Sequence, residues 1–205
     1  MRNLRHRDSS LACNVPNADV GRCTSFITVT DELWQQAINE NLLPAVRLDR
    51  GLLPSMIALG SGALIHISSI QRGFPLHDST LAYATVKAAL TNYNKALSNE
   101  VSPTGVRVVI VSSGLIETDA ATRMIERMAE KEDSDYATPW QKLMDMPGGT
   151  LLGRPTGPRR SPSWSSALRQ TGRRQSPGTE FVIDDGTIRT VYTQTAPASQ
   201  LEFSS

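Results

Sequence analysis

The chain has 205 residues and a formal net charge of +1, with 39% hydrophobic and 20% charged residues. This length is typical of one domain, and the balanced charge argues against a dedicated nucleic-acid or polyanion binder. No stretch reaches the roughly 18 apolar residues of a membrane span, and the basic start lacks the apolar run of a signal peptide. Cys13 and Cys23 form neither a disulfide framework nor a metal-ligand spacing. We therefore expect a soluble cytoplasmic domain with free thiols and no metal.

The first 29 residues show neither helical nor strand periodicity, and we expect an irregular segment there. A helix is predicted to begin after Thr30, a plausible N-cap that is followed by two acidic residues. Apolar residues recur at helical spacing to Val46, and Pro44 is expected to disturb that helix. A further apolar segment, 52–59, ends at a Gly-Ser-Gly turn.

The rest of the pattern alternates strands with helices. Strands are predicted at 63–69, 106–111 and 179–183, and a helix is predicted at 80–100. The first of these strands is apolar on both faces, as in a parallel sheet covered on both sides. This order predicts an α/β fold. Residues 191–205 are expected to form a flexible tail.

Tyr83 and Lys87 form a Tyr-x-x-x-Lys pair on the predicted helix, so both side chains share one face. A free phenol has a pKa of about 10, and a nearby ammonium would lower it by favouring the phenolate. A tyrosine tuned in this way can exchange a proton with an alcohol or carbonyl oxygen. The pair alone is also compatible with a surface lysine beside a half-buried tyrosine.

Ser69 ends the strand at 63–69, where parallel sheets place their active sites. Its hydroxyl is either a turn-forming cap or a hydrogen-bonding group for a substrate oxygen that gains charge. The second interpretation brings Ser69 to the same site as Tyr83.

Three segments, GALIHISSIQRG, LAYATVKAAL and GVRVVIVSSGLIET, resemble the catalytic strand, the catalytic helix and the following strand-turn of the short-chain dehydrogenase/reductase family. INENLLPAV matches the family's asparagine in the preceding helix at Asn41. The resemblance covers roughly residues 30–190 with one gap, which we treat as a partial family domain. It implies a Rossmann-like, three-layer α/β/α sheet and hydride transfer between a nicotinamide cofactor, NAD or NADP, and a secondary alcohol or ketone.

The resemblance also implies the role of each residue. Tyr83 would be the general acid/base, and Lys87 would lower the pKa of Tyr83 and hold the nicotinamide ribose. Ser69 would position the substrate oxygen, and Asn41 would support a proton relay through water. The residues expected at the nicotinamide are Tyr83, Lys87, Gly114, Ile116 and Thr118.

Two positions depart from the family pattern. Ser113 replaces the proline that normally precedes Gly114, which puts the rigidity of that loop in doubt. Asp185 replaces a glycine after the last strand, where we expect a strained turn.

The family's Gly-rich phosphate-binding turn and its first strands have no counterpart in the sequence. We therefore expect an incomplete sheet in which strand 63–68 lies at a free edge. Such an edge predicts a marginally folded chain that self-associates, and the missing turn predicts weak cofactor binding.

Residues 159–177 interrupt the resemblance with five arginines and no acidic residue. A nucleic-acid-binding patch is one interpretation. We favour an out-of-frame stretch, since the same bases read two positions later can encode a string that resembles the family's helix and turn.

Two functions therefore remain open. The first is an oxidoreductase of the family. The second is a non-catalytic remnant or interaction module that pairs with a related full-length subunit. Nucleotide binding would distinguish them.

Overall fold

The computed structural model describes residues 10–13, 29–75, 80–114 and 177–188, together with residue 116 and scattered positions between 122 and 141. Its helices and strands follow one another in the order β1 (Ser10–Cys13), α1 (Asp31–Asn41), α2 (Leu43–Leu59), β2 (Gly62–Ser69), η3 (Ile70–Arg72), α3 (Leu81–Val101), η4 (Ser102–Thr104), β3 (Val106–Ser113) and β4 (Glu180–Ile183).

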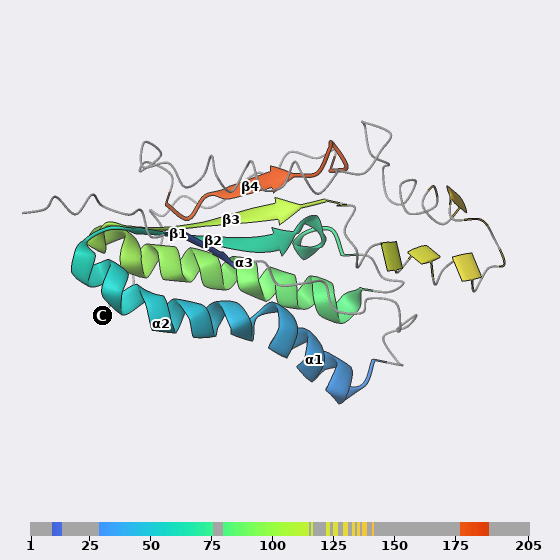
Figure 1. Cartoon of the computed structure of the whole chain (residues 1–205), viewed down its shortest axis with the longest axis horizontal. Helices are drawn as coiled ribbons and strands as arrows, with labels where there is room; N and C mark the ends of the chain where they lie inside the picture. Colours follow the sequence, from blue (N-terminus) through green and yellow to red (C-terminus); the bar gives the residue numbers. More distant parts are fainter. Residues whose placement is uncertain are drawn as a thin grey trace, which may run out of the picture.

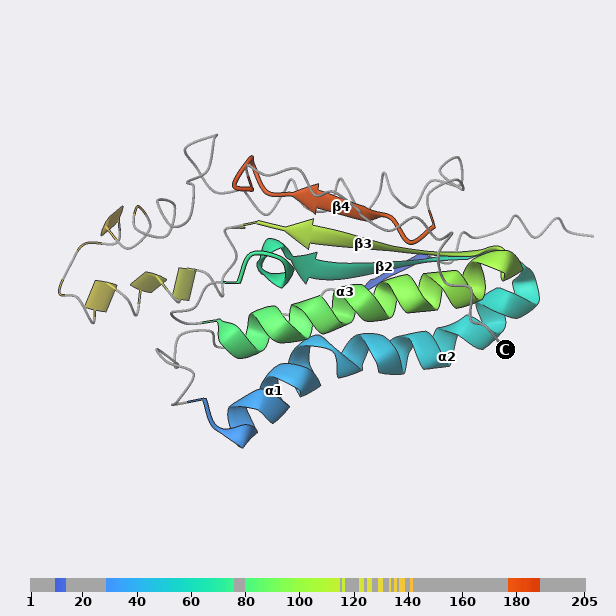
Figure 2. The same cartoon turned by 180° about the vertical axis from the view of Figure 1, so that it is seen from behind.

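The four strands form one parallel sheet in the order β1-β2-β3-β4. The predicted α/β class and the three predicted strands are confirmed. Figure 1 shows the sheet with α1, α2 and α3 together on one of its faces, and the reverse view in Figure 2 agrees.

The expectation of an irregular segment up to residue 29 is wrong for Ser10–Cys13. This segment pairs with β2 in parallel, from Ser10 opposite Ala63 to Cys13 opposite His66. The first half of β2 is therefore not a free edge, and the self-association expected from that edge loses its basis. Four residues are too short to show a period of two against a background of irregular sequence, which is why the pattern did not reveal this strand.

The predicted helix from Thr30 is confirmed, and its break lies at Leu42. The Leu33 N–H donates to the Thr30 Oγ1 at 3.5 Å, so Thr30 caps the helix as predicted. Pro44 falls in the first turn of α2, where a missing N–H costs nothing. A break directly after Asn41 places this residue at the junction of two helices.

The core between the helices and the sheet consists of aliphatic side chains from α2, α3, β2 and β3. Two buried clusters fill it: Met56, Leu64, Leu97, Val101, Val106 and Val108, and Ala45, Leu90 and Ile110. A third cluster of strand residues, Ile65, Val109 and Val111, occupies the opposite face of the sheet. Burial on both faces of β2 matches the apolar pattern of its sequence.

A glycine contact closes the amino-terminal end of the sheet. Gly105 has a φ of 86°, and a Cβ there would lie 2.2 Å from the Gly60 carbonyl oxygen. Only glycine permits this approach between the end of α2 and the start of β3. Within the described residues, no helix is both long and apolar enough to cross a membrane.

Candidate active site

The carboxyl ends of β2 and β3 lie side by side, with Ser69 opposite Ser113. Ligands of open parallel sheets bind at this edge. The short helix η3 follows β2 here, and the first turn of α3 packs against it. The topology thus brings the residues predicted from separate segments to one place.

Ser69 is buried and caps η3. Its Oγ accepts the Gln71 N–H at 3.3 Å, and its side chain also hydrogen-bonds the Tyr83 phenol. The capping interpretation of Ser69 is therefore confirmed, and its hydrogen bond to a substrate oxygen stays a prediction.

Lys87 is almost fully buried one turn after Tyr83. Its Nζ donates to the Ile67 carbonyl oxygen at 3.1 Å and lies 5.5 Å from the centroid of the Tyr83 ring. Behind it, the Ser68 Oγ donates to the Lys87 carbonyl oxygen at 3.2 Å. These bonds fix the helix that carries both residues to the strand that carries Ser69.

Burial raises the pKa of Tyr83 to about 12, and the hydrogen bond with Ser69 only partly opposes this rise. The Lys87 ammonium lies 5.5 Å from the centroid of the Tyr83 ring and bonds to Ile67, and its lowering of the Tyr83 pKa stays a prediction. Desolvation of the phenolate is the stronger effect. Tyr83 is accordingly a neutral phenol near pH 7, and such a group can donate a proton.

Asn41 is completely buried at the end of α1. Its Nδ2 donates to the Ala37 carbonyl oxygen at 3.1 Å, while its Oδ1 has no hydrogen-bond partner. An unpaired buried amide oxygen costs free energy of about 1–3 kcal/mol, and a water or ligand hydrogen would remove that cost. The orphaned oxygen therefore fits a site that is completed by another molecule.

Gly114 continues from β3 into the loop expected at the nicotinamide. Its N–H donates to the Ile183 carbonyl oxygen at 2.8 Å, and a Cβ there would lie 2.8 Å from the Asp184 Cα. The position thus requires glycine for packing against the end of β4. Ile116 is half-buried nearby in sequence, and Thr118 lies outside the described residues.

The two departures from the family pattern have structural consequences. The Ser113 Oγ reaches the Ser68 carbonyl oxygen at 3.5 Å, a weak substitute for the rigidity of proline. Asp185 has a φ of 51°, so the strained turn predicted there is confirmed. The side chain of the preceding Asp184 accepts the N–H groups of Gly186 and Ile188, which holds the turn in place.

Two polar clusters were not predicted from the sequence. One joins Arg72 and Ser112 to the Glu180 carboxylate across the sheet. The other is buried under α2 and α3 and contains His66, Asp49, Tyr93 and Asn94. A histidine inside an apolar strand is the one signal that could have pointed to the second cluster, since a buried polar group needs a partner.

Comparison with known proteins identifies the family. The short chain dehydrogenase family matches residues 3–129, which is more than half of the chain. The chain belongs to this family. The match begins well before residue 30 and includes β1, so the family resemblance extends further toward the amino terminus than the sequence motifs indicated.

Several curated relatives are oxidoreductases. The chain is 30% identical over 174 residues to the 3-oxoacyl-acyl-carrier-protein reductase FabG of Chlamydia trachomatis, with 84% of the chain and 63% of that protein covered. It is 27% identical over 186 residues to the oxidoreductase UcpA of Escherichia coli O157:H7, with 91% and 68% covered. The chain thus spans about two thirds of the length of these relatives.

Solved structures share the fold. An L-sorbose reductase from Gluconobacter frateurii, complexed with NADPH and L-sorbose, superposes with a TM-score of 0.80 at 28% identity, over 89% of this chain and 67% of that one. YwfH, an NADPH-dependent reductase of bacilysin biosynthesis, superposes with a TM-score of 0.75 at 17% identity, over 89% and 68%. At this lower identity the likeness concerns the fold alone.

Proposed function

We propose that the chain carries the catalytic site of an NAD(P)-dependent oxidoreductase that reduces a ketone to a secondary alcohol. The observation that carries the proposal is the hydrogen bond between Ser69 and Tyr83 with Lys87 one turn away, at the carboxyl edge of β2. A relative and a structural neighbour support the substrate class, since the FabG relative is named for a 3-oxoacyl substrate and the L-sorbose reductase for a ketose.

The nicotinamide cofactor supplies the hydride when it is bound. Tyr83 donates its phenolic proton to the carbonyl oxygen, and Ser69 holds that oxygen by a hydrogen bond. Tyr83 with its raised pKa holds its proton at neutral pH, and this is the protonation state that a general acid needs for reduction. Asn41 accepts a hydrogen bond from a relay water through its orphaned Oδ1.

The residues at the nicotinamide end of the site fit the cofactor in part. Lys87 is positioned by Ile67 beside Tyr83, and Gly114 leaves a tight, side-chain-free surface at the end of β3. We assign cofactor contacts to Tyr83, Lys87, Gly114, Ile116 and Thr118. The sequence holds no Gly-rich turn for the pyrophosphate, so we expect dissociation constants for NADH and NADPH in the millimolar range or weaker, about −4 kcal/mol.

A second candidate is a non-catalytic module that pairs with a related full-length subunit. The feature that favours it is that the printed sequence holds no Gly-rich phosphate-binding turn. We also propose that the folded chain forms homo-oligomers, though not through the first half of β2, which is paired with β1, and that its location is cytoplasmic. The lack of a disulfide pattern supports that location.

One experiment separates the two candidates. The intact chain is incubated with NADPH or NADH at several times the measured dissociation constant and with a panel of ketones, and ketone-dependent cofactor oxidation is followed by absorbance. Turnover that is lost in Tyr83→Phe supports the oxidoreductase. Saturated cofactor binding without turnover for any ketone favours the module.

A further inference from the structure

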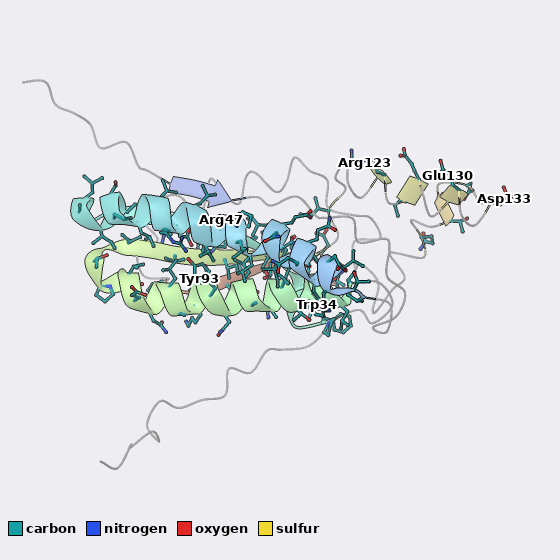
Figure 3. The ribbon with its side chains drawn as sticks, turned by 90° about the horizontal axis from the view of Figure 1, so that it is seen from below. Trp34, Arg47, Tyr93, Arg123, Glu130 and Asp133 are labelled. Atoms are coloured by element: carbon teal, nitrogen blue, oxygen red, sulfur yellow. The ribbon has the colours of Figure 1, made fainter. Side chains whose placement is uncertain are left out.

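A second buried polar cluster lies on the helix-facing side of β2, apart from Ser69. His66 of β2 contacts Asn94 of α3 through its Nδ1 at 2.9 Å, and it contacts both carboxylate oxygens of Asp49 of α2 through its Nε2 at 3.3 and 3.1 Å. All three side chains are at most 3% exposed. The Tyr93 hydroxyl adds a hydrogen bond to Asp49 at 2.9 Å, and Figure 3 shows Tyr93 on the side of α3 that faces α2.

The partners of the imidazole define its charge. A neutral histidine has one donor and one acceptor nitrogen, whereas an imidazolium has two donors. The Nε2 of His66 faces the Asp49 carboxylate, and its Nδ1 faces the Asn94 amide, whose oxygen is turned toward the ring. An imidazolium satisfies both of these contacts as a donor. We propose that His66 is a buried imidazolium, ion-paired with Asp49, and that this pair makes the packing of α2 and α3 on β2 sensitive to pH.

Charge balance supports the same conclusion independently. The Asp49 carboxylate is buried, and a buried charge is tolerated only when it is paired. Tyr93 cannot balance it, because a phenol is either neutral or negatively charged. The imidazole of His66 lies 3.1 Å from the carboxylate and can carry the balancing positive charge.

Among the described residues, the titratable side chains that hydrogen-bond to the Asp49 carboxylate are His66 and Tyr93. On β3 the residue paired with His66 is the apolar Ile110, and on β1 it is Cys13. The buried cation of α3, Lys87, bonds to the Ile67 carbonyl oxygen. Arg50 and Glu100 act on Tyr93 with opposite signs.

The direction of the pH effect follows from linkage. Only the protonated imidazole carries the charge that pairs with the Asp49 carboxylate. The contribution of the pair is therefore present while His66 holds its second proton and is lost as the pH rises and that proton leaves. Deprotonation removes the hydrogen from one ring nitrogen of His66, so that this nitrogen can no longer donate to the oxygen that it faces. It also removes the positive charge that balances Asp49.

The proposal also concerns the candidate active site. His66 lies three residues before Ser69 on β2, and Asn94 lies two turns after Lys87 on α3. The contact of His66 with Asn94 thus joins β2 and α3, the two elements that carry Ser69 and Tyr83, and the pair with Asp49 joins β2 to α2. Loss of the second ring proton of His66 would weaken these contacts without altering Ser69, Tyr83 or Lys87.

Nuclear magnetic resonance of the intact chain with nitrogen-labelled histidine tests the charge state directly. The sequence has three histidines, His6, His66 and His77, and the His66→Gln variant identifies the signals of His66. We expect both ring nitrogens of His66 to be protonated at about pH 7.5. A neutral ring at that pH, with one bare nitrogen facing a donor amide of Asn94, would overturn the proposal.

Urea unfolding at about pH 6 and pH 9 tests the consequence. Between these two pH values, we expect the unfolding equilibrium constant to rise at least about tenfold more in the native chain than in His66→Gln, which corresponds to about 1.4 kcal/mol. Tyr93→Phe serves as a matched control that keeps the His66–Asp49 pair and the pH effect. If His66→Gln does not fold, Asn94→Asp replaces it and is expected to move His66 deprotonation to higher pH. An equal pH response in native chain and His66→Gln, or no shift in Asn94→Asp, contradicts the proposal.

Discussion

Two buried polar clusters lie on the same pair of elements, β2 and α3, and they are built differently. The cluster of Ser69, Tyr83 and Lys87 lies at the open carboxyl edge of the sheet, near the junction where Asn41 keeps an unpaired oxygen. The cluster of His66, Asp49 and Asn94 lies under the helices, and its polar atoms bind one another. The comparison shows that the same interface between β2 and α3 can hold both a candidate ligand site and a set of buried polar side chains that bind one another.

The two tyrosines of α3 show the same contrast. Tyr83 is hydrogen-bonded to a neutral serine, and burial raises its pKa to about 12. Tyr93 donates to a carboxylate, which raises its pKa further in addition to burial. The two tyrosines therefore differ in their partner, since Tyr83 meets a neutral hydroxyl and Tyr93 meets a carboxylate.

The largest expected effect is the loss of activity in Tyr83→Phe. A positioned general acid contributes about 10²- to 10⁴-fold to rate, so the ketone-dependent oxidation of NADPH should fall by at least about 100-fold. Tyr93→Phe, ten residues later on the same helix, should retain activity within about tenfold. Equal losses in both variants would mean that the two tyrosines do not differ in function.

Asp49→Asn should have the largest effect on stability. The amide leaves the buried imidazolium of His66 without a counter-charge, and breaking a buried ion pair costs about 3–5 kcal/mol. Urea denaturation at about pH 6, where His66 is charged, measures this change in the free energy of unfolding. The double variant Asp49→Asn, His66→Gln should be less destabilised than the single variant, and a purely additive result would argue against the ion pair.

Alkaline pH should destabilise the chain through Tyr83 by a smaller amount. A pKa of about 12 in the folded chain and about 10 when unfolded favours the neutral phenol in the fold. This stabilisation is complete below about pH 10 and is lost as the pH rises toward 12, with a difference on the order of 2 kcal/mol. The urea midpoints of the native chain and of Tyr83→Phe are measured at several pH values across this range, and the change in their difference isolates the contribution of Tyr83. A difference that stays the same at every pH would show that Tyr83 titrates as if exposed.

The smallest expected effect concerns the turn after β4, at the edge of the sheet next to the candidate site. Asp185→Gly should stabilise the chain by up to about 1 kcal/mol, because glycine adopts the positive φ of 51° without strain. A thermal melt would measure it, with Asp185→Ala as the control that keeps the strain. A more stable alanine variant would show that the side chain, and not the backbone, sets the cost.

Much of this site could be predicted from the sequence because its residues obey local rules. The four-residue spacing of Tyr83 and Lys87 and the position of Ser69 at a strand end are fixed by helix and strand geometry. The helix expected at 80–100 is Leu81–Val101 in the structure. The pKa of Tyr83 could not be predicted, because its direction depends on burial and on where the Lys87 ammonium lies.

The features that could not be predicted from the sequence depend on contacts between segments that are far apart in the chain. The pairing of Ser10–Cys13 with β2 is visible only once the sheet is formed. The contact of His66 with Asp49 crosses 17 residues, and its contact with Asn94 crosses 28. No motif marks such a cluster, since its meaning comes from burial and not from spacing.

The central claim is that Tyr83 completes a reductase site in this chain, and isotope transfer tests it most directly. The intact chain is incubated with a ketone and with NADPH deuterated at the transferred position, at a cofactor concentration well above its dissociation constant. The account predicts a deuterated secondary alcohol from the native chain and none above background from Tyr83→Phe. Deuterated alcohol from Tyr83→Phe in equal amount, or none from the native chain with cofactor bound, would contradict it.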